Sequence, residues 1–252
     1  MNIKKFLKSK EKSNSFVDKH HFTSCVVPVA GKSTRTSGST PKQFVEIKGV
    51  PVIIRTLMSV NKCELIDEII VVCSKNDFEY YEKAKTKYGL NKISKIVEGG
   101  ETRFDSVKKG FDSISEKAEY VAIQDGARCL TKIGDYRRVI KAAYKYDAAI
   151  AVQNSTDTLK SIDENGNIGS TLDRNIVVRA QTPQVFEKTL YTVAIYNPKL
   201  KKGSVTDDSF LVESLGRKVV AVDCGSYNMK ITTDLDFMLA EKILESGVIN
   251  EN

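Results

Sequence analysis

The segment CVVPVAGKSTRTSGSTPKQF, residues 25–44, joins an apolar run to a polar loop that carries positive charge. The apolar run ends at Ala30 and Gly31, and the loop after it contains Arg35 and Lys42. This order is typical of a strand that leads into a phosphate-binding loop, because backbone N–H groups and cationic side chains both attract an anion. The segment matches neither G-x-G-x-x-G nor G-x-x-x-x-G-K-[ST]. It therefore predicts a phosphate loop of another kind.

Strand-like and helix-like segments alternate along most of the chain. The order is strand 24–30, helix 50–62, strand 66–73, helix 77–89, strand 93–100, helix 103–114, strand 119–127, helix 135–147, strand 148–153, helix 206–216, strand 217–223 and helix 232–246. Such alternation predicts an α/β fold with a mostly parallel sheet. Ligands of open α/β sheets bind at the carboxyl ends of the strands, where the motifs described below fall.

Two segments depart from this alternation. Residues 155–182 contain Asn165-Gly166 between polar and β-branched residues, a pattern that favours a β-hairpin, and we expect an extended β-arm inserted into the α/β core. Residues 1–21 hold six lysines and only two acids, and are expected to form a mobile basic extension. The remaining residues, 22–252, are expected to form one domain.

Histidine usage excludes several classes of enzyme. The only histidines are His20 and His21, so residues 22–252 contain none, and a Ser-His-Asp hydrolase, a His-ligated zinc site or a histidine general base is not expected. Chemistry must then depend on Lys, Arg, acids, hydroxyl groups and a hard metal ion.

Charge, cysteine content and hydropathy point to a cytoplasmic protein. The five cysteines form no C-x-x-C pair, and we interpret them as buried apolar side chains in a reducing cytosol. The net charge is +7, but about half of it comes from the basic extension, which is weak support for nucleic-acid binding. No apolar run is long enough for a membrane helix, so no stable membrane insertion is expected.

Three further motifs follow predicted strands. Gly99 and Gly100 allow close approach to a flat ligand, and Arg103 and Ser106 come at the start of the next helix. Asp125, at the end of a strand, is a candidate Mg²⁺ ligand beside a triphosphate. Lys230 precedes a helix that begins with a threonine pair. Each motif taken alone also fits a plain turn or helix cap.

The ordered set of blocks is more specific than any one motif. The blocks are AGKSTR…PKQF, GGETRFDSV, DGAR, DTLK, LDRN…AQTPQVF, TDDSFLVESLG and NMKITTDLDFMLAE. Together they resemble the 2-C-methyl-D-erythritol 4-phosphate cytidylyltransferases of the non-mevalonate isoprenoid pathway, over about residues 24–244. The related ribitol-5-phosphate cytidylyltransferases share most blocks, and TLDRN followed by QTPQVF favours the methylerythritol branch.

The resemblance implies a Rossmann-like three-layer nucleotidyltransferase fold and a role for each matching residue. CTP and a sugar or polyol phosphate are the implied substrates, with Mg²⁺ or another divalent cation as cofactor. The implied nucleotide-binding residues are Ala30, Gly31, Gly100, Glu101, Arg103 and Ser106. Arg35, Lys42 and Lys230 are implied to stabilise charge on the α-phosphate, and Asp125 to hold the metal. Tyr227 stands where relatives commonly have an acid, which removes a second candidate carboxylate ligand.

The resemblance also implies a homodimer in which the β-arm embraces a second subunit. Thr158 and Arg174 match positions that hold the incoming sugar phosphate, and Asp157 and Thr182 are expected to brace that region. Two alternatives remain at this point. One is a cytidylyltransferase for ribitol 5-phosphate or another polyol phosphate. The other is a nucleotide-binding or interaction protein that has lost catalysis, which substitutions at Lys32, Ser33 and Thr36 in the first loop would explain.

Overall fold

A computed structural model describes residues 12–31, 41–199 and 205–249 of the chain. Its elements follow in the order α1 (Asn14–Asp18), β1 (Thr23–Pro28), η2 (Lys42–Phe44), β2 (Glu46–Ile47), β3 (Val50–Pro51), α2 (Val52–Lys62), β4 (Glu68–Cys73), η3 (Lys75–Asp77), α3 (Phe78–Tyr88), β5 (Ile93–Glu98), α4 (Arg103–Phe111), β6 (Tyr120–Ile123), α5 (Ile133–Tyr146), β7 (Ala148–Asn154), β8 (Leu159–Ile162), β9 (Ile168–Leu172), β10 (Val178–Glu187), α6 (Lys188–Ile195), α7 (Asp208–Glu213), β11 (Val220–Asp223) and α8 (Asp234–Glu245).

A seven-stranded sheet in the order β11-β7-β10-β6-β1-β4-β5 forms the middle layer of the molecule. Its strands run parallel except β10, which is antiparallel to both β6 and β7. The predicted α/β fold with a mostly parallel sheet is therefore confirmed. Parallel strands covered on both faces are nearly continuous apolar runs, and β1 and β4 have this character.

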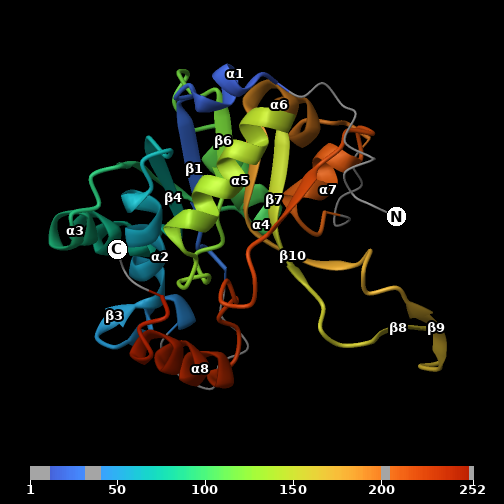
Figure 1. The fold of residues 1–252 in the computed structure, drawn as a ribbon. Helices are drawn as coiled ribbons and strands as arrows, with labels where there is room; N and C mark the ends of the chain where they lie inside the picture. Colours follow the sequence, from blue (N-terminus) through green and yellow to red (C-terminus); the bar gives the residue numbers. More distant parts are fainter. Residues whose placement is uncertain (1–11, 32–40, 200–204, 250–252) are drawn as a thin grey trace.

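Helices cover both faces of the sheet, because successive strand side chains point to opposite sides. Cys25 and Val27 of β1 pack with buried residues of α2, α3 and α5, whereas Val26 packs with residues of α4, α6 and α7. A smaller cluster joins β2, α8 and the segment after β6 below the sheet. In Figure 1, α1 and α8 lie at opposite ends of the molecule.

β10 is the one sheet strand that the alternation of patterns did not predict. Its carboxyl-terminal half is buried in the middle of the sheet, while its first residues, from Val178, are exposed and continue from the arm. The segment RAQTPQVF contains polar residues and Pro183, which lacks a donor for the ladder. Its register with β7 shifts between Ala180 and Gln184.

The β8–β9 hairpin extends away from the rest of the molecule, as Figure 1 shows. Its turn contains the predicted Asn165-Gly166 pair, with Gly166 at a φ of 83° that only glycine adopts easily. The Asp163 carboxylate accepts backbone N–H bonds from Asn165 and Asn167 and closes the turn. The hairpin lies within the arm predicted at 155–182.

Residues 12–21 of the predicted basic extension pack against the amino end of the sheet. The His21 ring is buried, with Nδ1 2.9 Å from Glu119 Oε2 and Nε2 2.9 Å from the Phe16 carbonyl oxygen. Lys12 Nζ donates to Tyr120 Oη at 2.8 Å and pairs with Asp147 at 2.6 Å. These contacts attach residues 12–21 to the domain, whereas residues 1–11 lie outside the described part of the chain.

Among the described residues, no helix is both long and apolar enough to span a membrane.

We predict that His21→Ala lowers the free energy of unfolding by about 2 kcal/mol, because it removes a buried ring together with its hydrogen bonds to Glu119 and to the Phe16 carbonyl oxygen. The adjacent His20 is a matched control. Its ring is exposed and pairs with Asp67 at the surface, so His20→Ala should change stability little. Urea denaturation of both variants measures the difference. Equal stabilities would show that docking of residues 12–21 contributes nothing to folding.

Candidate active site

A cavity of about 620 Å³ opens at the carboxyl ends of β1, β5 and β6. Four separate segments line it: residues 28–31 with Lys42 and Gln43, residues 100–103 with Ser106, residues 125–127, and Lys230. The predicted residues Ala30, Gly31, Lys42, Gly100, Glu101, Arg103, Ser106, Asp125 and Lys230 therefore meet around one space. Arg35 lies outside the described residues.

The glycine pair allows the β5–α4 turn to pass close to its neighbours. A Cβ at Gly99 would lie 2.3 Å from the Ala30 Cβ, and a Cβ at Gly100 would lie 2.3 Å from that of Asp105. Ser106 Oγ accepts the Gly100 N–H at 3.0 Å and donates to the Thr102 carbonyl oxygen at 2.9 Å. Thr102, rather than Ser106, caps helix α4, in a capping box with Asp105. Ser106 therefore holds the turn that faces the cavity.

Asp125 is the centre of a cluster of charged side chains. Lys230 Nζ lies 2.9 Å from Oδ2, Arg103 Nε lies 3.2 Å from Oδ1, and Arg128 Nε lies 3.8 Å from Oδ2. Burial alone would raise the pKa of Asp125, but these cations outweigh it and hold the pKa well below its usual value. The carboxylate is therefore ionised at neutral pH.

The Thr182 side chain holds the backbone of Asp125 in place. Its Oγ1 accepts the Asp125 N–H at 3.0 Å. This contact connects β10 with the end of β6 and places Thr182 beside Asp125 of the same chain. The sequence had instead suggested that Thr182 braces the region of the arm.

Asp208, at the start of α7, is a site residue that sequence reasoning missed. Arg103 Nη1 donates to its Oδ2 at 2.8 Å, and Tyr191 donates to its Oδ1 at 2.7 Å. Burial would lower the pKa of Arg103, but Asp208 and Asp125 together raise it above its ordinary value. Arg103 therefore stays charged between two carboxylates. The TDDSF block contained Asp208, but its sequence indicated only a helix start.

Arg128 is a second missed residue, although it stands in the DGAR block. Its Nη1 donates to the Asn228 carbonyl oxygen at 2.7 Å, while its buried Nε has no hydrogen-bond partner among the described residues. Burial lowers the pKa of Arg128; Asp125 opposes this effect, whereas the nearby Arg103 and Arg179 add to it. Arg128, Arg179 and Lys230 also line a second cavity, of about 500 Å³. Three cations around one space favour an anionic ligand.

The arm residues do not join this cluster within the same chain. Asp157, Thr158 and Arg174 are exposed and line neither cavity, and Arg174 Nη1 donates only to the Thr156 carbonyl oxygen, at 3.2 Å, among the described residues. Figure 1 shows that the β8–β9 part of the arm extends away from the core.

Comparison with known proteins identifies the family. The family model for 2-C-methyl-D-erythritol 4-phosphate cytidylyltransferase matches residues 23–246. The chain belongs to this family. The enzyme of that description from Caldanaerobacter subterraneus is 43% identical over 223 residues, covering 88% of this chain and 98% of the relative. The one from Syntrophus aciditrophicus is 39% identical over 221 residues, covering 87% and 94%.

A solved structure extends the likeness to three dimensions. The 4-diphosphocytidyl-2C-methyl-D-erythritol synthase from Anaerococcus prevotii superimposes with a TM-score of 0.81 at 32% identity, covering 92% of this chain and all of that chain. The resemblance seen in the sequence blocks is thus confirmed, together with the nucleotidyltransferase fold. The cavities of this cytidylyltransferase lie where that fold places ligands, at the carboxyl ends of the strands.

We predict that Asp125→Asn lowers the free energy of unfolding by about 2 kcal/mol at neutral pH, because Lys230 and Arg128 lose their counter-charge and Arg103 keeps only Asp208, although Arg103 and Lys230 retain partial access to water. The pKa of Asp125 is lower in the folded than in the unfolded protein. The ionised carboxylate therefore stabilises the fold above about pH 4, and this contribution is lost as the pH falls further.

Denaturation from pH 8 down to pH 2.5 measures this effect. The gap between wild type and Asp125→Asn should be constant above about pH 4 and should narrow below it. Glu79→Gln is a matched control, because Glu79 pairs with Lys83 at the exposed surface. This substitution should not change the free energy of unfolding measurably. A gap that stays the same down to pH 2.5 would contradict the assignment.

Proposed function

We propose that this protein transfers a cytidylyl group from CTP to 2-C-methyl-D-erythritol 4-phosphate and releases pyrophosphate. An oxygen of the substrate phosphate forms a bond with the α-phosphorus of CTP while the bond to pyrophosphate breaks, so the phosphate ester becomes a diphosphate ester. The attacking oxygen carries no proton at neutral pH, so no general base is needed. The single observation that carries the proposal is the group of cations from separate segments around one nucleotide-sized cavity.

The chemistry then depends on positioning and charge. Lys42 and Lys230 lie on the walls of the cavity and are proposed to stabilise the negative charge that develops on the α-phosphate, together with Arg35. Gly100, Glu101 and Ser106 border the space proposed for the cytosine. The cavity lined by Arg128, Arg179 and Lys230 adjoins it and is proposed to receive the sugar phosphate, because Lys230 belongs to both linings.

Mg²⁺ is proposed as the cofactor. Mg²⁺ commonly binds to one or two protein carboxylates and completes its shell with substrate phosphates and water. Asp125 supplies one ionised carboxylate in the lining, and among the described residues no cluster of three or more candidate ligands exists. This donor set fits a metal held jointly by Asp125 and the nucleotide. When bound, the ion would neutralise charge on the phosphate oxygens.

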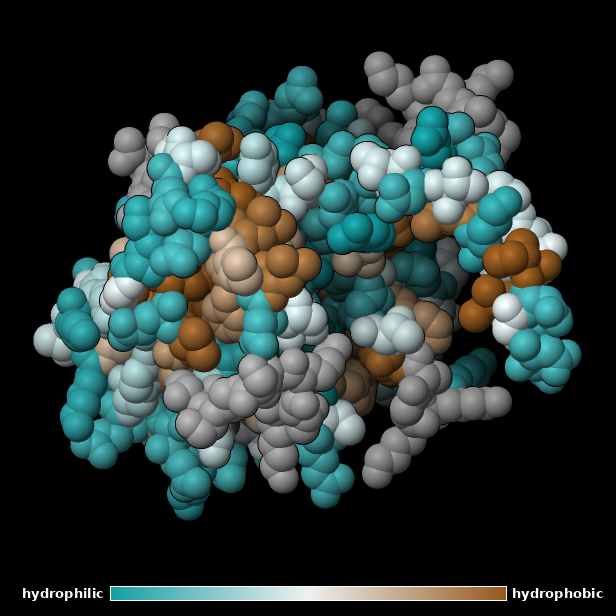
Figure 2. Space-filling view, turned by 90° about the horizontal axis from the view of Figure 1, so that it is seen from below, coloured by the Kyte–Doolittle hydropathy of each residue, from teal (hydrophilic) through white to brown (hydrophobic). Residues whose placement is uncertain are grey.

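A homodimer formed through the arm is also proposed. Apolar side chains on the arm, Ile162, Ile168 and Ile176, are each more than 60% exposed, and Figure 2 shows apolar atoms gathered at the end of the arm. A partner that covers them would remove this surface from water. Because Thr158 and Arg174 line neither cavity of their own chain, we propose that they complete the sugar-phosphate site of the partner.

A substrate panel tests the reaction. With CTP and Mg²⁺, 2-C-methyl-D-erythritol 4-phosphate should release pyrophosphate, with kcat/KM at least about tenfold above that for ribitol 5-phosphate. Absence of turnover with both would favour the inactive nucleotide-binding alternative. A preference for ribitol 5-phosphate would assign the other substrate.

Lys42→Ala and Lys230→Ala should each lower kcat by about 10²-fold or more, because each removes a cation proposed to act on the transition state. Lys199→Ala is a matched control, because Lys199 is exposed and distant from the cavities. Steady-state kinetics on correctly folded protein measures the effect. Wild-type turnover by both site variants would contradict the assigned roles.

Mixed dimers test whether the arm acts on the partner. Lys42→Ala and Arg174→Ala homodimers should both be weakly active. In a mixed dimer, one site would contain both substitutions and the other would be intact. After subunit exchange in an equal mixture, about half of the dimers are mixed, and each mixed dimer has one intact site out of two. The mixture should therefore recover about one quarter of wild-type activity. No recovery after verified exchange would show that each arm serves its own chain or none.

A further inference from the structure

A third cavity lies outside the proposed reaction site and shares no lining residue with either cavity described above. Its volume is about 430 Å³, within the range of small-molecule pockets. It lies between α2, the β2–β3 hairpin, the segment that follows Arg128, and the carboxyl-terminal residues of and after α8. The lining consists of Lys48, Val50, Arg55, Met58, Ser59, Lys62, Cys129, Thr131, Lys132, Ile133, Leu244 and Ile249.

Positive charge characterises one part of this lining. Four cations line the cavity, together with Ser59, and no acidic residue belongs to the described lining. Arg55 is the buried member, and its Nε and Nη2 donate to the Ile47 carbonyl oxygen at 3.0 and 2.7 Å, which fixes the guanidinium plane. A guanidinium held in this way, beside three lysines, is suited to an anion such as a phosphate or carboxylate.

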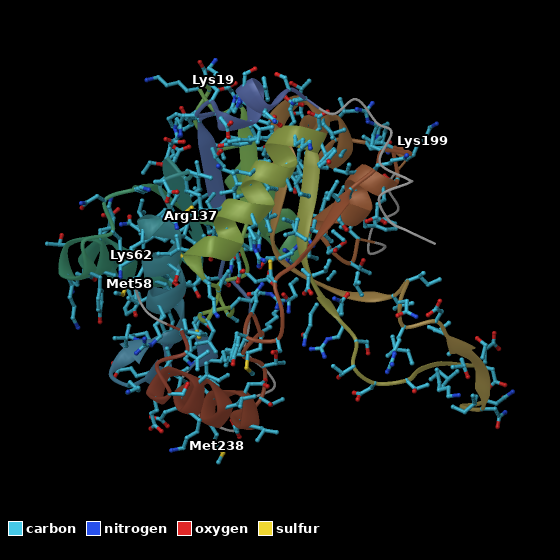
Figure 3. The ribbon with its side chains drawn as sticks, in the orientation of Figure 1. Lys19, Met58, Lys62, Arg137, Lys199 and Met238 are labelled. Atoms are coloured by element: carbon cyan, nitrogen blue, oxygen red, sulfur yellow. The ribbon has the colours of Figure 1, made fainter. Side chains whose placement is uncertain are left out.

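The rest of the lining is apolar. Val50, Met58, Cys129, Ile133, Leu244 and Ile249 supply aliphatic and sulfur-containing side chains from four segments. Figure 3 shows Met58 and Lys62 as neighbours on α2, so this helix contributes both an apolar and a cationic side chain to the lining. An inorganic anion alone would leave the apolar part uncovered. The charge and the apolar surface together match a molecule that has an anionic head and a short apolar chain.

The cavity adjoins two segments that also shape the reaction site. Lys48 and Val50 follow η2, which contains Lys42, and Val52 donates its N–H to the Val45 carbonyl oxygen at 3.0 Å. Thr131 Oγ1 lies 2.9 Å from the Arg128 carbonyl oxygen and 2.7 Å from Asn228 Oδ1. A ligand here would therefore contact the backs of both walls without entering the reaction cavity.

We propose that this cavity is a second ligand site, which binds a small anion joined to a short apolar chain and is separate from the nucleotide site. The proposal depends only on the lining of this cavity and not on which sugar phosphate the enzyme uses. A binding measurement therefore tests it even if the proposed reaction fails.

Hexyl phosphate is a suitable probe, because it combines both features, and its phosphorus resonance permits a titration by ³¹P NMR. The nucleotide site is first saturated with a CTP analogue that has a methylene group between the α- and β-phosphorus atoms and therefore cannot transfer its cytidylyl group. Under this condition the wild-type protein should still bind hexyl phosphate at one site. Inorganic phosphate, without the apolar chain, should bind at least about tenfold more weakly.

Lys62→Ala and Lys132→Ala should each weaken binding of hexyl phosphate about fivefold, as expected for a lost charge-assisted contact near the surface. Lys199→Ala removes an exposed lysine far from the cavity and should leave the affinity unchanged. Unchanged affinity in both pocket variants, displacement of hexyl phosphate by the CTP analogue, or absence of binding would each overturn the proposal.

Discussion

The ion pairs of Asp125 are the interaction on which the site depends. Arg103 begins α4, Arg128 follows β6, and Lys230 precedes α8, so the three cations come from distant parts of the chain. Without the carboxylate, they would repel one another inside a partly dry cavity. Asp125 thus allows positive charge to be assembled before an anion arrives. A site organised in this way needs little rearrangement when charge develops during the reaction.

The sequence predicted most of what lies near the strand ends. A buried strand, a glycine turn and a helix start are local features, and the motifs around Gly31, Gly100 and Asp125 occupy the expected edge of the sheet. The ordered sequence blocks predicted the reaction and its substrates. A fold class alone cannot do this, because one fold serves many reactions and the substrate depends on the residues of the site. The family assignment supports that part of the prediction.

Other features depend on contacts between distant residues, which local patterns do not reveal. Asp208 is recognisable as a partner of Arg103 only when α7 is folded against α4, and Arg128 only when the Asn228 segment covers it. β10 combines polar residues with Pro183, so its place in the sheet follows from its neighbours rather than from its own pattern. The lysines of residues 1–21 indicated a solvated extension, but the pattern did not show that His21 would be buried between Glu119 and Phe16.

β10 joins the arm to the centre of the domain as one continuous strand. It begins beside the exposed arm at Val178 and continues through Thr182, which holds the backbone of Asp125, to Glu187, whose carboxylate caps α6. Before Pro183 the strand pairs with β7 alone, from Val178 to Ala180, and it is paired on both sides only from Gln184 onward. A displacement of the arm would therefore meet Thr182, whose hydroxyl group accepts the Asp125 N–H, before it meets the part of β10 that is held on both sides. The orientation of the Asp125 backbone is in this way linked to the root of the arm by a single side-chain contact.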